Sequence, residues 1–161
     1  MLYNAYVRSK LEVASIIWES LQENRINQVE MVQKKFLKFL SKKIYGIDDR
    51  FTTYSVVLAR HEACALSIRR SQANFLYAFK ILHGFECNQS FLERFFFNVR
   101  PRGTRQTTLI YLPFARIELF KASPIYRVCS TVNRYEELDI FCTSLRQIKT
   151  FFKSKPCNNL G

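Results

Sequence analysis

The sequence predicts a mainly α-helical fold, with a helical bundle over about residues 1–86 and a smaller helical segment over residues 87–161 that holds at most a short β-hairpin. Apolar residues recur at helical spacing along most of the chain. Glycine and proline number only 4 each among 161 residues, which argues against a turn-dense all-β fold. Hydrophobic residues make up 48% of the chain and include 15 phenylalanines, so the chain has enough apolar surface to form a core.

The first two predicted helices span about residues 2–18 and 24–44. The first begins with no capping residue before it, so we expect the chain to begin partway through a larger architecture. In the second, Asn24 is the candidate cap and Gly46 ends the helix. Its apolar positions fall within about 140° of one another at about 100° per residue and are expected to form the core side: Ile26, Val29, Val32, Phe36, Leu37, Leu40 and Ile44.

The third predicted helical region covers about residues 54–82, with a break expected around residues 62–66. Gly84 is its natural stop, because glycine readily adopts the left-handed conformation that ends many helices. Arg69 and Arg70 are expected on its outer side. A short helix is expected over about residues 88–97.

The last third of the chain begins with a basic loop over residues 98–106. The stretch that follows, residues 107–117, is rich in β-forming residues, but Pro113 limits it to a hairpin at most. Two helices are expected after it. One begins with Ser123 as cap and Pro124 in the first helical position, and the other is capped by Asp139.

The charge of the chain points to a polyanionic partner. Lys and Arg number 25 against 13 Asp and Glu, a formal net charge of +12, and the excess is spread over both halves of the chain rather than gathered in a tail. This balance favours nucleic acid first and an anionic membrane surface second. A generally basic protein with no special partner is the plainer interpretation.

The basic helix over residues 24–44 is the strongest candidate for a functional element. Lys34, Lys35, Lys38 and Lys42 fall within an arc of about 100°, on the side away from the apolar positions. Lysines at this spacing can follow a phosphate backbone, with release of counterions. A solvated lysine face and a membrane-surface helix are the alternatives. We favour nucleic acid, because a helical core is expected to use up the apolar side that a membrane would need.

No catalytic or metal site is predicted. The chain has no nucleotide-binding glycine motif and no zinc-binding spacing of cysteine and histidine, and the segment from Tyr45 to Asp49 is one residue too long for the Tyr-x-Asp-Asp signature of polymerases. We therefore interpret Asp48 and Asp49 as part of a polar loop between helices. No cofactor, small-molecule substrate or membrane-spanning segment is expected. Five dispersed cysteines favour reduced thiols and an intracellular location, in the nucleus or cytoplasm.

Several blocks of residues resemble a known family. The segment Val7–Trp18, with Leu2 and Tyr3 before it, is similar to the "LY…LVRSKLEYASxxW" helix of reverse transcriptases from non-LTR retrotransposons of the jockey type. The helix Ile26–Phe36 follows in the same order as in that family. The resemblance covers about residues 1–153. Further matches lie in the segments 69–84, 97–105 and 123–133, and those nearest the C-terminus are looser.

The resemblance implies the thumb and C-terminal region of such an enzyme, without the palm whose aspartates hold magnesium. A chain of this kind would bind an RNA/DNA duplex or RNA and would not polymerise DNA by itself. The resemblance implies phosphate contacts by the four lysines and, as second choices, by Arg69, Arg70, Arg102 and Arg105. The alternative is a helical protein-interaction module with no nucleic-acid role.

Overall fold

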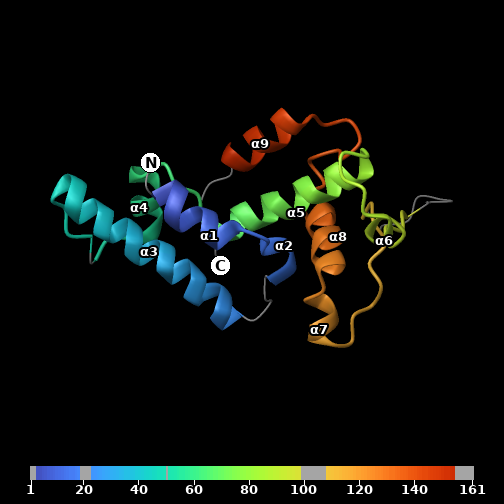
Figure 1. The fold of residues 1–161 in the computed structure, drawn as a ribbon, viewed down its shortest axis with the longest axis horizontal. Coiled ribbons are helices and arrows are strands. Elements are labelled where there is room, and N and C mark those ends of the chain that lie inside the picture. The colour runs from blue at the N-terminus through green and yellow to red at the C-terminus, as the bar shows by residue number, and fades with distance from the viewer. Residues whose placement is uncertain (1–2, 19–22, 50, 99–107, 155–161) are drawn as a thin grey trace. The chain divides into compact units, whose positions relative to one another are not determined.

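The computed structural model describes residues 3–18, 23–49, 51–98 and 108–154, and the prediction of a mainly helical chain is confirmed in these ranges. The only β-pairing among the described residues is one antiparallel bridge between Phe97 and Ile110. The helices of Figure 1 are, in chain order, η1 (Tyr3–Arg8), α1 (Ser9–Glu12), α2 (Ser15–Trp18), α3 (Glu23–Tyr45), α4 (Tyr54–Arg60), α5 (Leu66–Leu82), α6 (Gln89–Leu92), α7 (Glu118–Lys121), α8 (Pro124–Arg134) and α9 (Leu145–Ser154).

The described residues form two compact units. The residues up to Arg70, together with those from Phe151 onward, make up the first unit, and Ser71–Thr150 make up the second. One division between them therefore falls inside α5. The division inferred from the sequence, between residues 86 and 87, lies beyond the end of that helix and stays a prediction.

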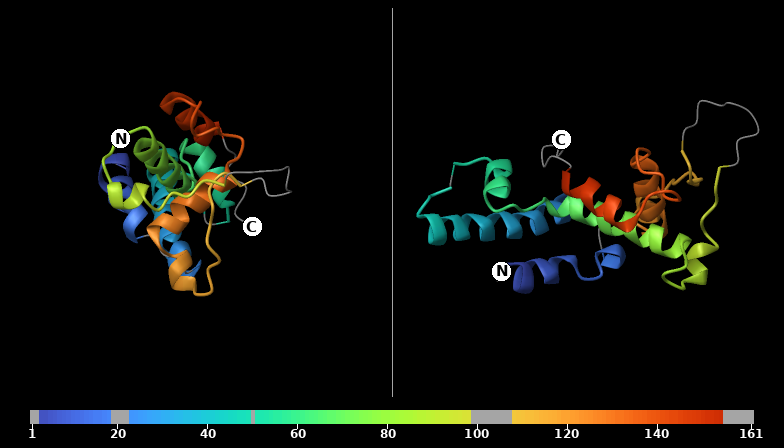
Figure 2. Two further views of the ribbon diagram at one scale, coloured as in Figure 1. Left: turned by 90° about the vertical axis from the view of Figure 1, so that its right-hand side faces the viewer. Right: turned by 90° about the horizontal axis from the view of Figure 1, so that it is seen from above.

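Helix α3 is the longest element, with 23 residues. The view from above in Figure 2 shows it as one continuous helix. It ends where the sequence predicts, because Gly46 adopts a positive φ of 67° and donates its N–H to the carbonyl of Lys42 at 3.2 Å. Helix α4 packs against α3 within the first unit.

The buried side of α3 differs from the predicted one. Its fully buried positions are Gln33, Leu37 and Ser41, which follow one another at intervals of four residues. Val32 and Ile44, expected in the core, are exposed. The reason is that α4 and the turn after it present hydrogen-bonding groups to α3, so polar side chains are satisfied there. Leu37 still belongs to an apolar cluster with Val57, Leu58 and Ala65.

The first predicted helix is interrupted rather than continuous. Helix α1 ends at Glu12, and Ala14 adopts a positive φ of 53° before α2 begins. A left-handed residue cannot continue a right-handed helix, which corrects the expectation of a single helix over residues 2–18. The segment η1 before α1 is a π-helix, which hydrophobic spacing alone does not distinguish from an α-helix.

The break predicted around residues 62–66 is confirmed. Helix α4 ends at Arg60 and α5 begins at Leu66, with Glu62 in the left-handed conformation between them at φ 48°. The N–H of Ala63 donates to the carbonyl of Leu58 at 2.9 Å, and the N–H of Glu62 to that of Ala59 at 3.2 Å. These two bonds form a Schellman ending, in which the residue with positive φ is usually glycine.

The second unit is organised around α8, which begins as the sequence predicts. Ser123 caps it by accepting a hydrogen bond from the N–H of Tyr126 at 3.4 Å, and Pro124 occupies its first turn. Asn133 near its end donates to the carbonyl of Ile110 at 2.7 Å and accepts from the N–H of the same residue at 2.9 Å. This pair of bonds ties the bridge region to the helix.

The last helix begins later in the chain than the sequence predicts, which corrects the expected cap. The sequence predicts a cap at Asp139, but α9 begins at Leu145 with Ser144 accepting from the N–H of Gln147 at 3.3 Å. Asp139 instead accepts from the N–H of Phe141 at 2.9 Å within a turn. Asp and Ser stabilise turns and helix starts by the same kind of hydrogen bond, so spacing alone does not decide which of them caps the helix.

Candidate nucleic-acid interface

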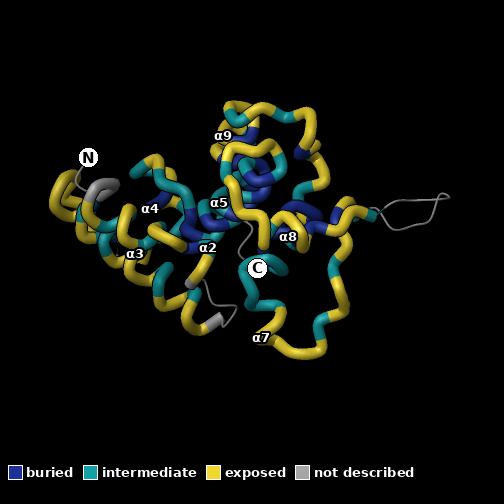
Figure 3. Tube along the Cα trace, turned by 45° about the vertical axis from the view of Figure 1, so that its right-hand side comes forward, coloured by how far each residue is buried: buried dark blue, intermediate teal, exposed yellow. Residues whose placement is uncertain are grey.

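Four lysines of α3 form a basic row that begins next to its buried stripe, with Lys34 and Lys38 nearer to the stripe than Lys35 and Lys42. Lys34, Lys38 and Lys42 follow one another at intervals of four residues, and Lys35 lies beside them. Lys35 and Lys42 are exposed, Lys34 and Lys38 are partly exposed, and none of the four is buried. Figure 3 shows most of the α3 trace as exposed or intermediate. The four lysines therefore follow one side of a continuous helix, and their contact with phosphates stays a prediction.

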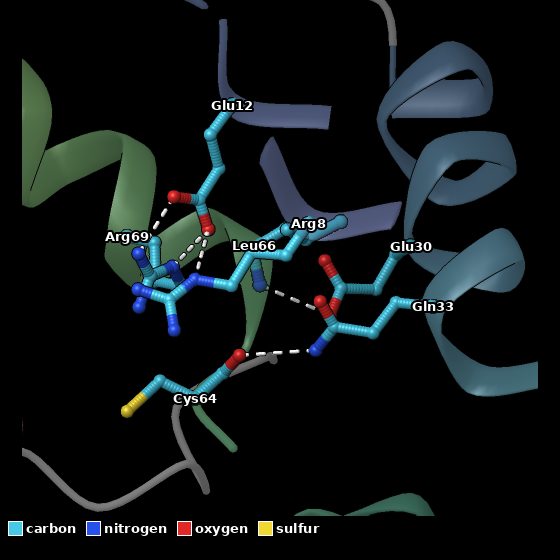
Figure 4. Close-up of polar contacts among 7 residues, drawn as sticks. All are labelled: Arg8, Glu12, Glu30, Gln33, Cys64, Leu66 and Arg69. Carbon is cyan, nitrogen blue, oxygen red and sulfur yellow. Dashed lines mark hydrogen bonds and ion pairs between the residues drawn. The ribbon is translucent and has the colours of Figure 1, made fainter. Parts of the chain in front are cut away.

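Polar side chains in the first half of α3 form hydrogen bonds with residues of α4, α5 and the turn between them, and Figure 4 shows part of this set. Gln33 donates from Nε2 to the carbonyl of Cys64 at 3.0 Å. Glu30 accepts on Oε1 from the hydroxyl of Tyr54 at 2.7 Å and from the N–H of Leu66 at 3.2 Å. Because hydrogen bonds are directional, these contacts fix the rotation of α3 about its axis and hence the direction in which the lysines point.

A second anchor lies at the C-terminal half of α3. The hydroxyl of Ser41 is 2.9 Å from Nε2 of His61. Asp49, which follows the helix, is buried and forms an ion pair with Arg60. A hydrogen bond from Ser41, which is the larger cause, and one from Arg60 lower the pKa of Asp49 to about 2. Asp49 is thus a structural carboxylate, and it anchors the loop that follows the basic helix.

Lys34 is also in contact with an aromatic ring. Its Nζ lies 5.8 Å from the centroid of the Tyr54 ring, within the range of a cation–π interaction. Since the hydroxyl of Tyr54 donates to Glu30, one side chain of α4 holds two positions of α3. This contact orients the first lysine of the row.

Arg69 and Arg70, the second-choice contacts on α5, do not lie on an open basic surface. Arg69 donates from Nη2 to Glu12 Oε2 at 2.6 Å and from Nε to Oε1 of the same carboxylate. Arg8 donates to that Oε1 at 3.0 Å (Figure 4). Arg70 is only 2% exposed, so its assignment to a surface contact is corrected. Both arginines occur in the first turns of α5, where Arg69 is partly exposed and Arg70 is buried.

The other two second-choice residues, Arg102 and Arg105, lie outside the described residues. Two neighbours of the lysine row are not singled out by the sequence pattern. Lys43 is exposed, and Phe39 is 55% exposed. A signal for Phe39 is nevertheless present in the sequence, because it falls outside the arc of apolar positions predicted for the core.

Among the described residues, no three His, Cys, Asp or Glu side chains are grouped so that they could hold a metal ion. Within the same ranges, no helix has both the length and the apolar character needed to cross a membrane. Cys64, Cys87, Cys129 and Cys142 are free thiols. Burial raises the pKa of Cys129 to about 12, so this thiol is an unreactive part of the interior.

No family model, curated protein or solved structure matches this chain. Any inference about its function therefore depends on its own residues and their geometry.

Proposed function

We propose that this chain binds nucleic acid, as an RNA/DNA duplex or RNA, through Lys34, Lys35, Lys38 and Lys42 of α3. The observation that supports this function is the basic row itself, four lysines along one side of a helix whose neighbouring buried stripe is held by hydrogen bonds. A rigid row of ammonium groups suits the repeating charge of a phosphate backbone. Contacts of this kind are independent of base sequence.

The resemblance described above leads us to propose further that the chain corresponds to the thumb and C-terminal region of a non-LTR retrotransposon reverse transcriptase. In this proposal the chain holds the primer–template duplex and supplies no catalytic group. We accordingly expect no primer extension by the purified chain, and a location in the nucleus or cytoplasm. A primer-extension assay with magnesium present checks the first expectation.

The decisive experiment is the salt dependence of binding to a short RNA/DNA hybrid. The variant K34Q/K35Q/K38Q/K42Q should bind more weakly, and the slope of log K against log salt should fall by up to about four units, roughly one for each phosphate contact removed. A matched control, R134Q/R146Q/K149Q/K153Q, removes the same charge from exposed positions of α8 and α9. An unchanged slope in the first variant, or an equal change in both, would contradict the proposal.

A helical protein-interaction module is the second candidate function. It is favoured by large apolar side chains that lie in solvent, above all the fully exposed Phe51, with Ile44 and Tyr45 also exposed. Binding of this kind would depend only weakly on salt, because apolar contacts release few counterions. The salt titration above therefore separates the two candidates.

A further inference from the structure

Phe39 has an exposed aromatic ring beside the basic row of α3, between that row and Lys43. It is 55% exposed, and Lys35, Lys42 and Lys43, each one helical turn away, are exposed as well. Residues three or four apart on a helix have Cβ atoms about 5–6 Å from one another, so the ring is flanked by ammonium groups on both sides along the helix.

The ring of Phe39 is supported from one side. The centroid of the Phe36 ring lies 6.5 Å away, with the two planes tilted by 44°. This is within the range of a favourable aromatic pair, and it restricts the rotamers of Phe39. The ring is thus held at the surface of the helix rather than folded away.

Contacts between lysines and phosphates do not require an aromatic ring and so do not account for the exposed ring of Phe39. In a closed duplex each base is stacked between its neighbours, so a ring on the outside meets only sugar and phosphate. An unpaired nucleotide differs, because it offers the flat face of its base together with a phosphate on either side. Aromatic rings within basic surfaces bind single-stranded nucleic acid in this way.

We propose that Phe39 stacks on an unpaired base, with Lys35, Lys42 and Lys43 contacting the phosphates that flank it. The inference rests on the proposed function and deepens it. The ligand of α3 is then a duplex from which a single strand continues, and Phe39 contacts the first unpaired stretch. A partner protein or a lipid surface would use the same side chain only as an apolar anchor, and leucine would serve equally well.

The test compares three probes: a blunt RNA/DNA hybrid, the same hybrid with a short single-stranded overhang, and the hybrid with an abasic overhang of equal length. The two overhangs have the same phosphates, so any difference in affinity between them reports contacts with bases. We expect the wild-type chain to favour the overhang with bases. Phe39→Leu should reduce this preference by roughly fivefold or more, the lower end of what one base–aromatic stack contributes.

Three variants make the result interpretable. Phe39→Trp keeps a stacking surface and should retain the preference for bases, whereas Phe114→Leu, at an exposed position in the second unit, should leave it unchanged. Circular dichroism of each variant checks that the fold is intact. The quadruple lysine variant should lower the affinity for all three probes.

The outcomes separate the inference from the function on which it rests. If the lysine variant binds all probes as tightly as the wild-type chain, the proposed function fails. If it binds weakly but Phe39→Leu keeps the full preference for bases, the proposed function stands and the stacking inference is wrong. Binding to phosphatidylserine vesicles that Phe39→Leu preserves, with no preference for bases in the overhang, would assign the ring to a membrane surface and also overturn the inference.

Discussion

Asp49 is a residue whose surroundings in the fold determine its role. Next to Asp48 in the sequence it belongs to a pair of carboxylates, the kind of pair that binds metal in polymerases. In the fold its side chain is buried and bound to Arg60, while Asp48 is exposed. The two neighbours thus have different roles, and the loop interpretation of this segment agrees with their geometry.

The lowered pKa of Asp49 predicts a pH-dependent contribution to stability. Because its folded-state pKa of about 2 lies below the ordinary value of 3.8, the ionised group stabilises the fold above pH 4, and this contribution is lost as the pH falls toward 2. Asp49→Asn should therefore be destabilised relative to the wild-type chain at pH 7, and the difference should shrink between pH 4 and pH 2.

Urea unfolding of both proteins at several pH values measures this difference. Asp48→Asn is the control at the exposed neighbour and should show a smaller effect at every pH. A difference between Asp49→Asn and the wild-type chain that stays constant down to pH 2 would contradict the assignment.

At the scale of the element, helix endings were easier to predict than helix starts. Gly46 and Gly84 end α3 and α5 with positive φ values of 67° and 71°. Asp139 does not begin α9, since Ser144 takes that role. Glycine has a special backbone conformation that few residues share, whereas several polar residues can cap a helix, so the stop signal is the more specific one.

The end of α4 predicts a stabilising substitution. Glu62 adopts a positive φ in a Schellman ending, where a side chain is strained and glycine is not. Glu62→Gly should raise the free energy of unfolding by about 0.5–1 kcal/mol, as measured by urea denaturation. Glu62→Ala is the matched control, because alanine retains the strain and should give no such gain. An equal gain in both variants would mean that the glutamate side chain, not the backbone, is unfavourable there.

At the scale of the whole molecule, the described residues divide into two compact units, each with buried apolar side chains of its own. Leu58 belongs to the cluster of the first unit, and Val132 is buried on α8 in the second. Units that are each stabilised by the packing of their own side chains can open separately.

Hydrogen exchange tests this division. Leu58→Ala leaves a cavity and should cost about 2–5 kcal/mol. The destabilisation should appear as faster amide exchange in α3 and α4. Val132→Ala should accelerate exchange in α8 and leave α3 and α4 unchanged. Faster exchange throughout the chain in both variants would show that the two units unfold as one.

The local features of this chain could be read from the order of its residues. The helical class, the endings at Gly46 and Gly84 and the break before Leu66 all follow from propensity, turn chemistry and periodicity, which act over a few residues. The assignment of a nucleic-acid partner follows from charge and from a resemblance, and it stays a proposal.

Contacts between distant segments decided the rest. Gln33 and Ser41 are buried because acceptors and donors more than 15 residues away meet them. Arg70 is buried, and Arg69 is paired with the distant Glu12. The same arrangement leaves Phe39 in solvent among the lysines. A helical pattern predicts which side chains share a face, but only the neighbours that the fold supplies determine which face is buried.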